Sequence, residues 1–333
     1  MESFEGKLAV VTGGGTGMGR ELCQQLVRAG ARVAMCDVSL TAMEETRALC
    51  IAAGAAAENV SVFLADVSDE QAMTAFAAHV TDAHDSDHIH LLFNNAGIGG
   101  AGSFVSDDRD LWEKTFAVCW YGVYYGCRAF LPLLMKADEG AVINTSSVNG
   151  FWASLGPGTA HTAYSAAKFA VKGFTEALIT DFRLNAPHLF AVLVMPGHIG
   201  TSIAINSGAV LGQNAALDLT AEEVADLRER LIAAGLPVSN VPDDDLRQMM
   251  HQRALDFRDK APTTAAQAAT IILDGVRERR WRVLVGADAV HLDAQVRQDP
   301  ESAYEPSFIQ RIMEAGHMRP LTEATGSVPP AAD

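Results

Sequence analysis

The chain alternates short apolar segments with longer amphipathic ones, and this alternation constrains its fold more than any other feature. The short segments have the length and composition of buried strands, and they cover residues 8–11, 33–36, 62–64, 91–93, 142–143 and 191–194. The segments between them have helical periodicity, and they cover residues 20–29, 40–53, 69–83, 111–135 and 163–184. Repeated strand–helix units build a parallel sheet with helices on both faces. The pattern therefore predicts a doubly wound α/β fold.

The pattern changes after Gly200. Residues 220–234 and 244–260 read as polar amphipathic helices, and residues 264–279 and 281–285 then read as a helix and a closing strand. We therefore expect one Rossmann-type domain over residues 1–333 that leaves the sheet and returns to it. Its expected parts are a cofactor-binding and catalytic core at 5–201, a helical substrate-lid insertion at 202–262, a return to the core at 263–290 and a C-terminal extension at 291–333, with a frayed end at 326–333.

Composition narrows the possible partners. The 333 residues include 41 acidic and 25 basic side chains, for a net charge of −16, which disfavours binding to nucleic acid or to anionic membranes. No apolar run is long enough to span a bilayer and no basic-then-apolar leader opens the chain, so we expect a cytoplasmic protein. The five cysteines form no CxxC pair, which argues against a disulfide framework or a zinc site. We expect them to be small core residues.

A glycine-rich turn follows the first predicted strand directly and reads Thr-Gly-Gly-Gly-Thr-Gly-Met-Gly over residues 12–19. Glycines permit the tight turn, and they let backbone amides and the start of a helix approach a pyrophosphate. The residues expected at this contact are Gly13, Gly17, Met18 and Gly19. On its own the turn could equally be a flexible loop.

Asp37 ends the second predicted strand, close to the spacing at which a dinucleotide site holds the adenosine ribose. A carboxylate there accepts from both ribose hydroxyls and repels a 2′-phosphate, and the next residues, Val38 and Ser39, are uncharged. NAD is therefore expected in preference to NADP. The alternative is that Asp37 caps the following helix, a role that Ser39 could also fill.

Two further loops follow strands on the same side of the predicted sheet. Asp66 and Val67 follow the third strand, where Asp66 could either reach the adenine amino group or cap the next helix. The sequence Asn94-Asn95-Ala96-Gly97 follows the fourth strand, where the small residues Ala96 and Gly97 would let a cofactor lie flat. The amides would tie neighbouring strands together.

Tyr164 and Lys168 are four residues apart on a predicted helix, so their side chains leave the same face. A free phenol has a pKa of about 10, and bringing it to neutrality requires about 4 kcal/mol of differential stabilisation. A nearby ammonium and a positively charged nicotinamide both favour the phenolate. Upstream, Ser146 and Ser147 end the fifth strand, where Ser147 could polarise a substrate oxygen while Ser146 satisfies backbone groups.

Taken together and in this order, the glycine turn, Asn-Asn-Ala-Gly, the double serine and Tyr-x-x-x-Lys resemble the short-chain dehydrogenase/reductases over about residues 5–201. The resemblance implies that Ser147, Tyr164 and Lys168 are catalytic and that Lys168 also holds the nicotinamide ribose. It implies cofactor contacts at Gly13, Gly17, Gly19, Asp37, Asp66, Val67, Asn94 and Gly97. The segment from Pro196 and Gly197 to Thr201 resembles the part that orients the nicotinamide carboxamide, through Ile199 and Thr201.

Two departures from the family pattern stand out. Cys119 occupies the position of an asparagine that holds a water in the proton relay to the lysine, so proton exchange is expected to be slower or rerouted, for example through His161. The gap between Ser147 and Tyr164 is also longer than usual and contains Pro157, Gly158 and His161.

These residues predict an NAD(H)-dependent oxidoreductase that interconverts a secondary alcohol and a ketone. The length of the insertion favours a bulky and largely apolar substrate, and Phe151, His161 and His198 are candidates for its pocket. The alternatives are a sensor that binds NAD(H) without turnover, suggested by Cys119, and an epimerase or dehydratase that regenerates NAD in each cycle. The resemblance also implies a homodimer or homotetramer packed through 111–135 and 163–184.

Three histidines near Asp82, Asp85 and Asp87, at positions 84, 88 and 90, superficially suggest a metal site. A polar turn before a strand is more often solvated, and the family resemblance requires no metal. We therefore expect no metal in this protein.

Overall fold

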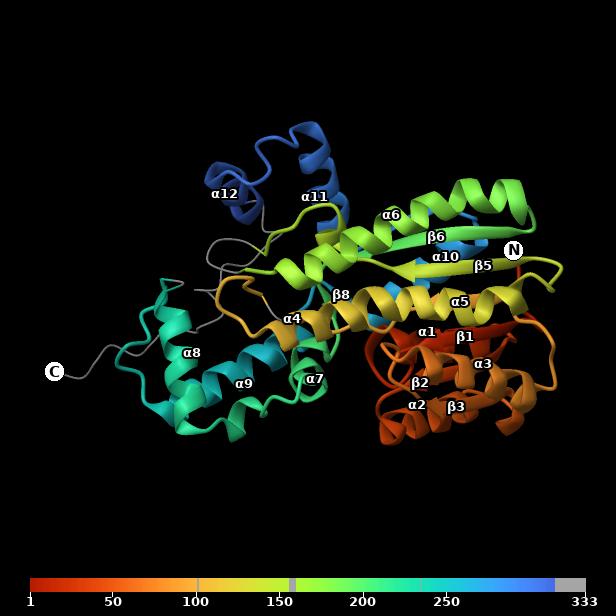
Figure 1. Cartoon of the computed structure of the whole chain (residues 1–333), viewed down its shortest axis with the longest axis horizontal. Helices are drawn as coiled ribbons and strands as arrows, with labels where there is room; N and C mark the ends of the chain where they lie inside the picture. The colour runs from red at the N-terminus through yellow and green to blue at the C-terminus, as the bar shows by residue number, and fades with distance from the viewer. Residues whose placement is uncertain (101, 156–159, 234, 315–333) are drawn as a thin grey trace.

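Seven parallel strands form the central sheet of the protein, whose computed structural model describes residues 1–100, 102–155, 160–233 and 235–314 (Figure 1). The strand order is β3-β2-β1-β4-β5-β6-β9. The bounds are β1 (Leu8–Thr12), β2 (Arg32–Asp37), β3 (Val60–Leu64), β4 (Leu91–Asn94), β5 (Gly140–Thr145), β6 (Leu189–Pro196) and β9 (Arg282–Val285). The order reverses between β1 and β4, which opens a crevice at their carboxyl ends where such folds bind ligands. The predicted doubly wound fold is confirmed.

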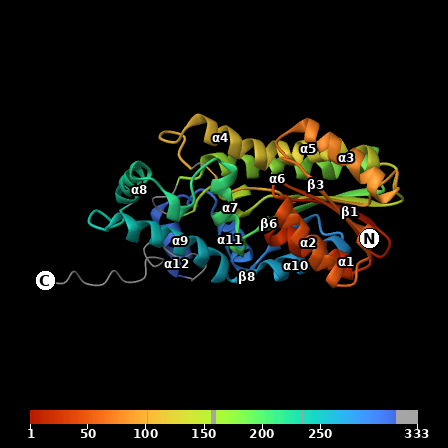
Figure 2. The same ribbon diagram turned by 90° about the horizontal axis from the view of Figure 1, so that it is seen from below.

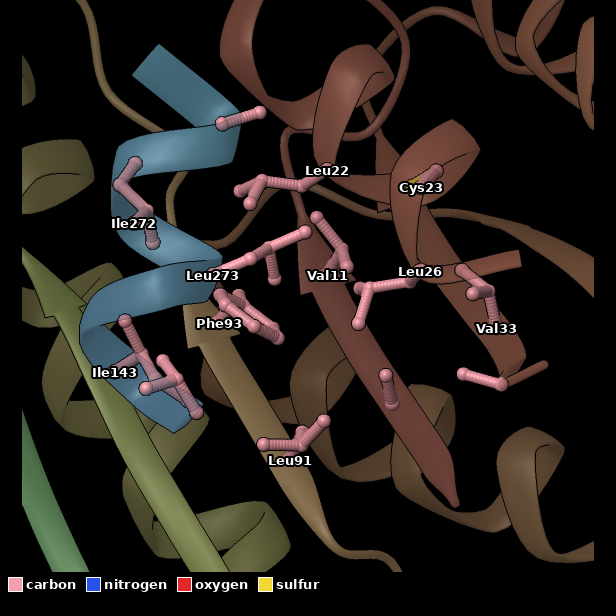
Figure 3. Packing of buried hydrophobic residues seen from close by; sticks show 14 of the residues in the cluster. Val11, Leu22, Cys23, Leu26, Val33, Leu91, Phe93, Ile143, Ile272 and Leu273 are labelled. Atoms are coloured by element: carbon pink, nitrogen blue, oxygen red, sulfur yellow. The ribbon is translucent and has the colours of Figure 1, made fainter. Parts of the chain in front are cut away.

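Helices cover both faces of this sheet (Figure 2). One face carries α1 (Gly17–Arg28), α2 (Leu40–Ala52) and α10 (Ala265–Arg277), and the other carries α3 (Glu70–His84), α4 (Arg109–Phe116), α5 (Gly122–Leu134) and α6 (Thr162–Asn185). Alternate residues of a strand face the two helix layers, so β1 is buried along its whole length. Figure 3 shows Val11 packed with Leu22 and Leu26 of α1 and with Leu273 of α10.

The segment predicted as one helix over 111–135 is interrupted in the structure. A π-helical turn at Ala117–Tyr121 separates α4 from α5. Apolar and aromatic residues occur on several sides of this segment, so the sequence periodicity did not reveal the extra residue in the turn. The turn carries Cys119, and its consequences for the site are described below.

Between β6 and β9 the chain leaves the sheet. It forms β7 (Ile199–Gly200), α7 (Ile203–Val210), α8 (Ala221–Ala233), α9 (Asp243–Asp259) and β8 (Thr263–Thr264). Helices α8 and α9 lie beyond the carboxyl ends of the strands (Figure 1). A small buried cluster that includes Val224, Leu231 and Leu246 holds them together, apart from the clusters that line the sheet.

After β9 the chain forms two helices that the sequence analysis did not predict, α11 (Ala287–Gln298) and α12 (Pro306–Glu314). They enclose a third cluster in which Trp152 packs with Leu292, Phe308 and Ile312. The last residues, 326–333, for which fraying was expected, lie outside the described residues.

The five cysteines are free and buried, as small core residues would be. Within the described ranges, no helix combines the length and the apolar character that crossing a bilayer requires.

Candidate active site

The glycine turn after β1 forms a cradle of bare backbone at the start of α1. Gly13 and Gly17 have left-handed φ values of +67° and +53°, which favour glycine. A Cβ added to Gly13 would lie 2.9 Å from the Cα of Ala96, and one added to Gly19 would collide with the carbonyl oxygen of Gly13. The Met18 side chain packs against the core. The turn therefore excludes side chains at Gly13 and Gly19, and it presents bare backbone at a helix N-terminus, the kind of site that binds phosphate groups.

Asp37 lies against this cradle. Its Oδ2 accepts a hydrogen bond from the backbone N–H of Gly15 at 3.0 Å, and its Oδ1 accepts one from that of Ser39 at 3.1 Å. The cap of α2 is Ser39, whose hydroxyl oxygen accepts from the N–H of Ala42. The helix-capping alternative for Asp37 therefore does not hold, and the carboxylate faces the turn.

Arg20 is a neighbour of this site that the sequence analysis overlooked. Its Nε donates to the Gly15 carbonyl and to the Thr46 hydroxyl, both at 3.0 Å, and its guanidinium pairs with Glu45 at 2.9 Å. Arg20 precedes Asp37 by 17 residues in the sequence and reaches the turn from α1. These bonds hold the Arg20 guanidinium at the Glu45 carboxylate and at the Gly15 carbonyl oxygen.

Asp66 is tied into the loop before α3. It accepts from the backbone and hydroxyl of Ser68 and pairs with Lys114 at 2.6 Å. Burial opposes ionisation of Asp66, but the bonds from Lys114 and Ser68 outweigh it and lower the pKa of the carboxyl. Asp69, and not Asp66, caps α3. Val67 is buried against Gly122 at the start of α5.

The two asparagines after β4 have different roles. The Asn94 amide is buried and donates to the side chain of Asn144 at 2.9 Å, which ties β4 to β5. The Asn95 amide donates to the Thr12 carbonyl at 3.1 Å, and the N–H of Ala96 donates to the Thr12 hydroxyl at 3.0 Å. Asn95 therefore contacts the glycine turn directly, although the sequence analysis assigned the border of the cleft to Asn94, Ala96 and Gly97.

Ser147, Tyr164 and Lys168 are brought together at the carboxyl end of β5. The Lys168 ammonium is buried, donates to the Thr145 carbonyl at 2.8 Å and lies 5.4 Å from the centre of the Tyr164 ring. Ser147 lies near enough to Tyr164 to lower the pKa of its phenol, and its Oγ accepts from the N–H of Asn149 at 3.1 Å. Ser146 donates instead to the Lys168 carbonyl at 2.8 Å, which is the structural role considered for it.

The electrostatics of Tyr164 differ from the expectation. Burial raises the pKa of its phenol above the usual value, the nearby Cys119 adds to this, and Ser147 acts in the opposite direction. Burial also lowers the pKa of Lys168. The Lys168 ammonium lies by the face of the Tyr164 ring, and a positive charge at this place also favours the phenolate.

Cys119 is placed beside Lys168 by the π-helical turn. Its thiol is buried and donates to the Ile98 carbonyl at 3.3 Å. A Cβ added to Gly97 would lie 3.5 Å from the Lys168 ammonium and 3.9 Å from the Cys119 sulfur. The thiol therefore joins the π-helical turn to the loop after β4, next to the candidate catalytic lysine.

The segment from Pro196 to Thr201 returns the chain from β6 to the glycine turn. A Cβ added to Gly17 would lie 3.1 Å from the Cβ of Thr201, and Ile199 pairs with Thr263 in the small sheet β7–β8. Helix α11 supports this segment, because the His198 N–H donates to the Asp288 carboxylate of α11 at 2.6 Å, and a Cβ on Gly197 would strike that carboxylate.

The three candidate pocket residues occupy different surroundings. The His161 ring lies 4.6 Å from that of Tyr164, and burial lowers the pKa of His161 to about 4, so the ring is neutral at pH 7. His198 stacks on Phe257 of α9, and its Nε2 is hydrogen-bonded to the Phe257 carbonyl at 2.8 Å. Phe151 packs beside Trp152, under the Arg282 guanidinium. Pro157 and Gly158 lie outside the described residues.

The histidines before β4 have structural partners. His84 is hydrogen-bonded to the Ser61 hydroxyl at 2.9 Å, and the Nδ1 of His90 accepts from the Leu8 N–H at 3.1 Å. His88 pairs with Asp87. Among the described residues no group of histidine, cysteine and carboxylate side chains is arranged to hold a metal ion.

Comparison with known proteins agrees with this geometry. Residues 7–210 match the family model described as short chain dehydrogenase. SadH of Mycobacterium tuberculosis is 32% identical over 95% of this chain and 97% of its own length. The levodione reductase of Leifsonia aquatica is 32% identical over 61% of this chain and 73% of its own. The crystal structure of a short chain dehydrogenase/reductase from Burkholderia phymatum in complex with NAD superposes with a TM-score of 0.72, at 28% identity, and covers 92% of this chain and 98% of that one.

The glycine cradle, the carboxylate of Asp37 beside it and the buried ammonium of Lys168 fit a nicotinamide dinucleotide. With the family match over most of the core, these features lead to one conclusion. This chain belongs to the short-chain dehydrogenase/reductase family and is an oxidoreductase that uses a nicotinamide cofactor on a small-molecule substrate.

Proposed function

We propose that the protein is an NAD(H)-dependent oxidoreductase that interconverts a secondary alcohol and a ketone, with Ser147, Tyr164 and Lys168 as its catalytic residues. The observation that carries this proposal is the grouping of these three side chains at the carboxyl end of β5, with the Lys168 ammonium by the face of the Tyr164 ring and anchored on the Thr145 carbonyl. The neighbouring crevice between β1 and β4 is where a doubly wound sheet binds its cofactor.

The nicotinamide supplies the carbon that exchanges hydride with the substrate. Ser147 donates a hydrogen bond to the substrate oxygen and orients it toward Tyr164. The Tyr164 oxygen takes the hydroxyl proton when the alcohol is oxidised and returns a proton when the ketone is reduced. Lys168 keeps its ammonium beneath the Tyr164 ring, where it binds the nicotinamide ribose and lies on the path of the proton.

We further propose that NAD is preferred to NADP. Asp37 places its negative charge at the glycine turn, where it would repel a 2′-phosphate, and the guanidinium of Arg20 is paired with Glu45. The similar protein from Burkholderia phymatum was crystallised in complex with NAD. The remaining cofactor contacts proposed are those of Asp66, Val67, Asn94, Ala96, Gly97, Ile199 and Thr201.

The substrate is proposed to bind under the insertion, residues 202–262. Helices α8 and α9 lie beyond the carboxyl ends of the strands and have their own small core. A separate core of this kind is what a lid that moves as one unit requires. His161 is the pocket candidate with the strongest support, because its neutral ring lies beside Tyr164. A lid of this size suits a bulky and largely apolar alcohol or ketone.

The test is a Tyr164→Phe variant assayed with NAD and NADH on panels of secondary alcohols and ketones. Because loss of a general acid–base costs about 10²- to 10⁴-fold in rate, turnover should fall to near background while NADH binding, followed by fluorescence, persists. The matched control is Tyr121→Phe. Tyr121 is the exposed last residue of the π-helical turn, and this variant should remain active. An active Tyr164→Phe would refute the acid–base role.

The same assay separates the alternatives. Wild-type protein that binds NADH but turns over no member of the panels would be a sensor. Conversion of substrate without net change in NADH would instead identify an epimerase or dehydratase.

We propose, finally, that the protein is a homodimer or homotetramer packed through α4, α5 and α6. Three large side chains on this surface are exposed in the single chain: Tyr121 by 42%, Tyr124 by 36% and Phe169 by 41%. Such a patch is typical of an interface between subunits. Phe169→Glu should lower the mass measured by light scattering, whereas a wild type that is monomeric at every concentration would contradict the proposal.

A further inference from the structure

The segment that follows Ser147 is held from outside by the C-terminal helices. Trp152 is 1% exposed, and its indole N–H donates to the Ala303 carbonyl at 2.7 Å. The next residue, Ala153, donates its backbone N–H to the Tyr304 hydroxyl at 3.0 Å. The Trp152 ring also packs against Phe308, with 5.8 Å between ring centres. Figure 1 shows α11 and α12 together beside the end of the sheet from which this segment leaves.

Phe151, the residue before Trp152, is also held by the C-terminal part of the chain. Phe151 lies under the Arg282 guanidinium, 5.8 Å from its central carbon. Arg282 is fixed in turn by two hydrogen bonds to Asp293 of α11, and both of these charged side chains are largely buried. A paired, buried guanidinium is rigid, because breaking the pair would leave a charge without a partner. Three consecutive residues, 151–153, therefore depend on 282–308 for their position.

Asn149 connects this clamp to Ser147. Its buried amide donates to the Trp152 carbonyl at 3.0 Å and to the Ser154 carbonyl at 2.9 Å. Its backbone N–H donates to the Ser147 oxygen at 3.1 Å. That bond occupies an acceptor site of the Ser147 oxygen and fixes its position, and it leaves the hydroxyl proton available to a substrate oxygen.

The other side of the same short turn is pressed against α6. Ser146 donates to the Lys168 carbonyl, and a Cβ on Gly150 would lie 2.8 Å from that oxygen. The turn that carries Ser147 is thus held between α6 and the C-terminal helices. Without the C-terminal helices, the contact with α6 would support this turn from one side only.

We propose that the C-terminal segment 303–308, which lies outside the part matched by the family model, positions Ser147 for the reaction, with Trp152 and Tyr304 as positioning residues. This inference rests on the proposed function, since it assigns Ser147 its polarising role. Neither residue touches the reacting atoms in this scheme. They act through Asn149 on the orientation of the Ser147 hydroxyl.

The test begins with Tyr304→Phe, which removes one hydroxyl from a side chain that is 55% exposed and so leaves the fold intact. Loss of one hydrogen bond that orients the catalytic turn should lower kcat by about five-fold, with NADH affinity unchanged. The pH–rate profile for alcohol oxidation should shift to higher pH, because a displaced Ser147 no longer favours the Tyr164 phenolate. Trp152→Phe should lower kcat further and should shift the pH–rate profile further toward high pH.

Gln310→Ala is the matched control, because this exposed residue of α12 bonds to Glu314 and not to the clamped segment. It should keep the wild-type kcat and profile. A Tyr304→Phe enzyme with wild-type kcat and profile would overturn the inference, as would a loss of thermal stability without a shift of the profile. If Trp152→Phe does not fold, Tyr304→Phe decides alone.

Failure of the inference and failure of the proposed function are distinguishable. If the wild type turns over no substrate, or if Tyr164→Phe is active, the proposed function fails and the role of Tyr304 falls with it. If the wild type is active and Tyr164→Phe is not, an unchanged Tyr304→Phe enzyme overturns only the positioning role.

Discussion

Tyr164 shows how one residue's chemistry depends on competing surroundings. Burial and the nearby Cys119 raise the pKa of its phenol, whereas Ser147 lowers it. The sequence placed Lys168 one helical turn away, but the structure aims its ammonium at the Thr145 carbonyl and the face of the ring. Spacing along the helix therefore predicted that the two side chains meet, and the tertiary structure decided how the ammonium is oriented toward the ring.

Asp37 is the residue on which cofactor choice is predicted to depend. Asp37→Ala removes the acceptor for the ribose hydroxyls and the charge that repels a 2′-phosphate, so kcat/KM should fall for NAD and rise for NADP. A change of about 2 kcal/mol in the difference between the two cofactors corresponds to a shift of roughly thirty-fold in their ratio. Steady-state kinetics with both cofactors measures it.

The control for this prediction is Asp69→Ala, which removes the cap of α3 and should lower stability without changing cofactor preference. A wild type that already favours NADP would show that the interpretation of Asp37 is wrong.

At the scale of elements, the π-helical turn between α4 and α5 is the feature that most affects the site. It directs the Cys119 thiol to the Ile98 carbonyl and brings the sulfur beside Lys168. A π-helical turn often marks a functional position, because the extra residue re-aims a side chain. Here it joins the long helix to the loop that borders the cofactor crevice.

This junction predicts a contrast between two variants of Cys119. Cys119→Val leaves the buried Ile98 carbonyl without its donor and should lower the free energy of unfolding by about 1–3 kcal/mol. Cys119→Ser retains a donor and should remain closer to the wild type. Urea denaturation compares them, and equal stability of the two variants would show that the thiol contributes no useful hydrogen bond.

At the scale of the whole molecule, buried neutral histidines make stability depend on pH. Burial lowers the pKa of His84 and of His90 from 6.5 to about 4. Between these values the unfolded chain binds protons that the folded chain does not, so stability is lost as pH falls from about 6.5 to about 4. The loss approaches roughly 3 kcal/mol per histidine as an upper limit.

The measurement is urea denaturation across this pH window. The double variant His84→Gln, His90→Gln should show a flatter dependence, because glutamine does not titrate and can still accept a hydrogen bond. His251→Gln, on α9, is the control and should keep the wild-type slope. A double variant with an unchanged slope would show that other groups control acid unfolding.

The sequence by itself determined the parallel α/β architecture, the glycine turn, Asp37 beside it and the pairing of Tyr164 with Lys168. Each depends on local spacing: strand and helix periods decide which faces are buried, and four residues along a helix bring two side chains to one side. Glycine at 13 and 17 was similarly informative, because their backbone conformations exclude most other residues.

Only the tertiary structure decided how these parts are held. It placed Asn95 rather than Asn94 at the glycine turn, opened the π-helical turn at Cys119 and clamped Trp152 on Ala303. The partners in the last of these contacts are 151 residues apart, and no periodicity or motif links them. Such contacts arise when elements far apart in the chain pack together, here in a buried cluster of their own beside the sheet, and a sequence pattern that is read locally cannot predict them.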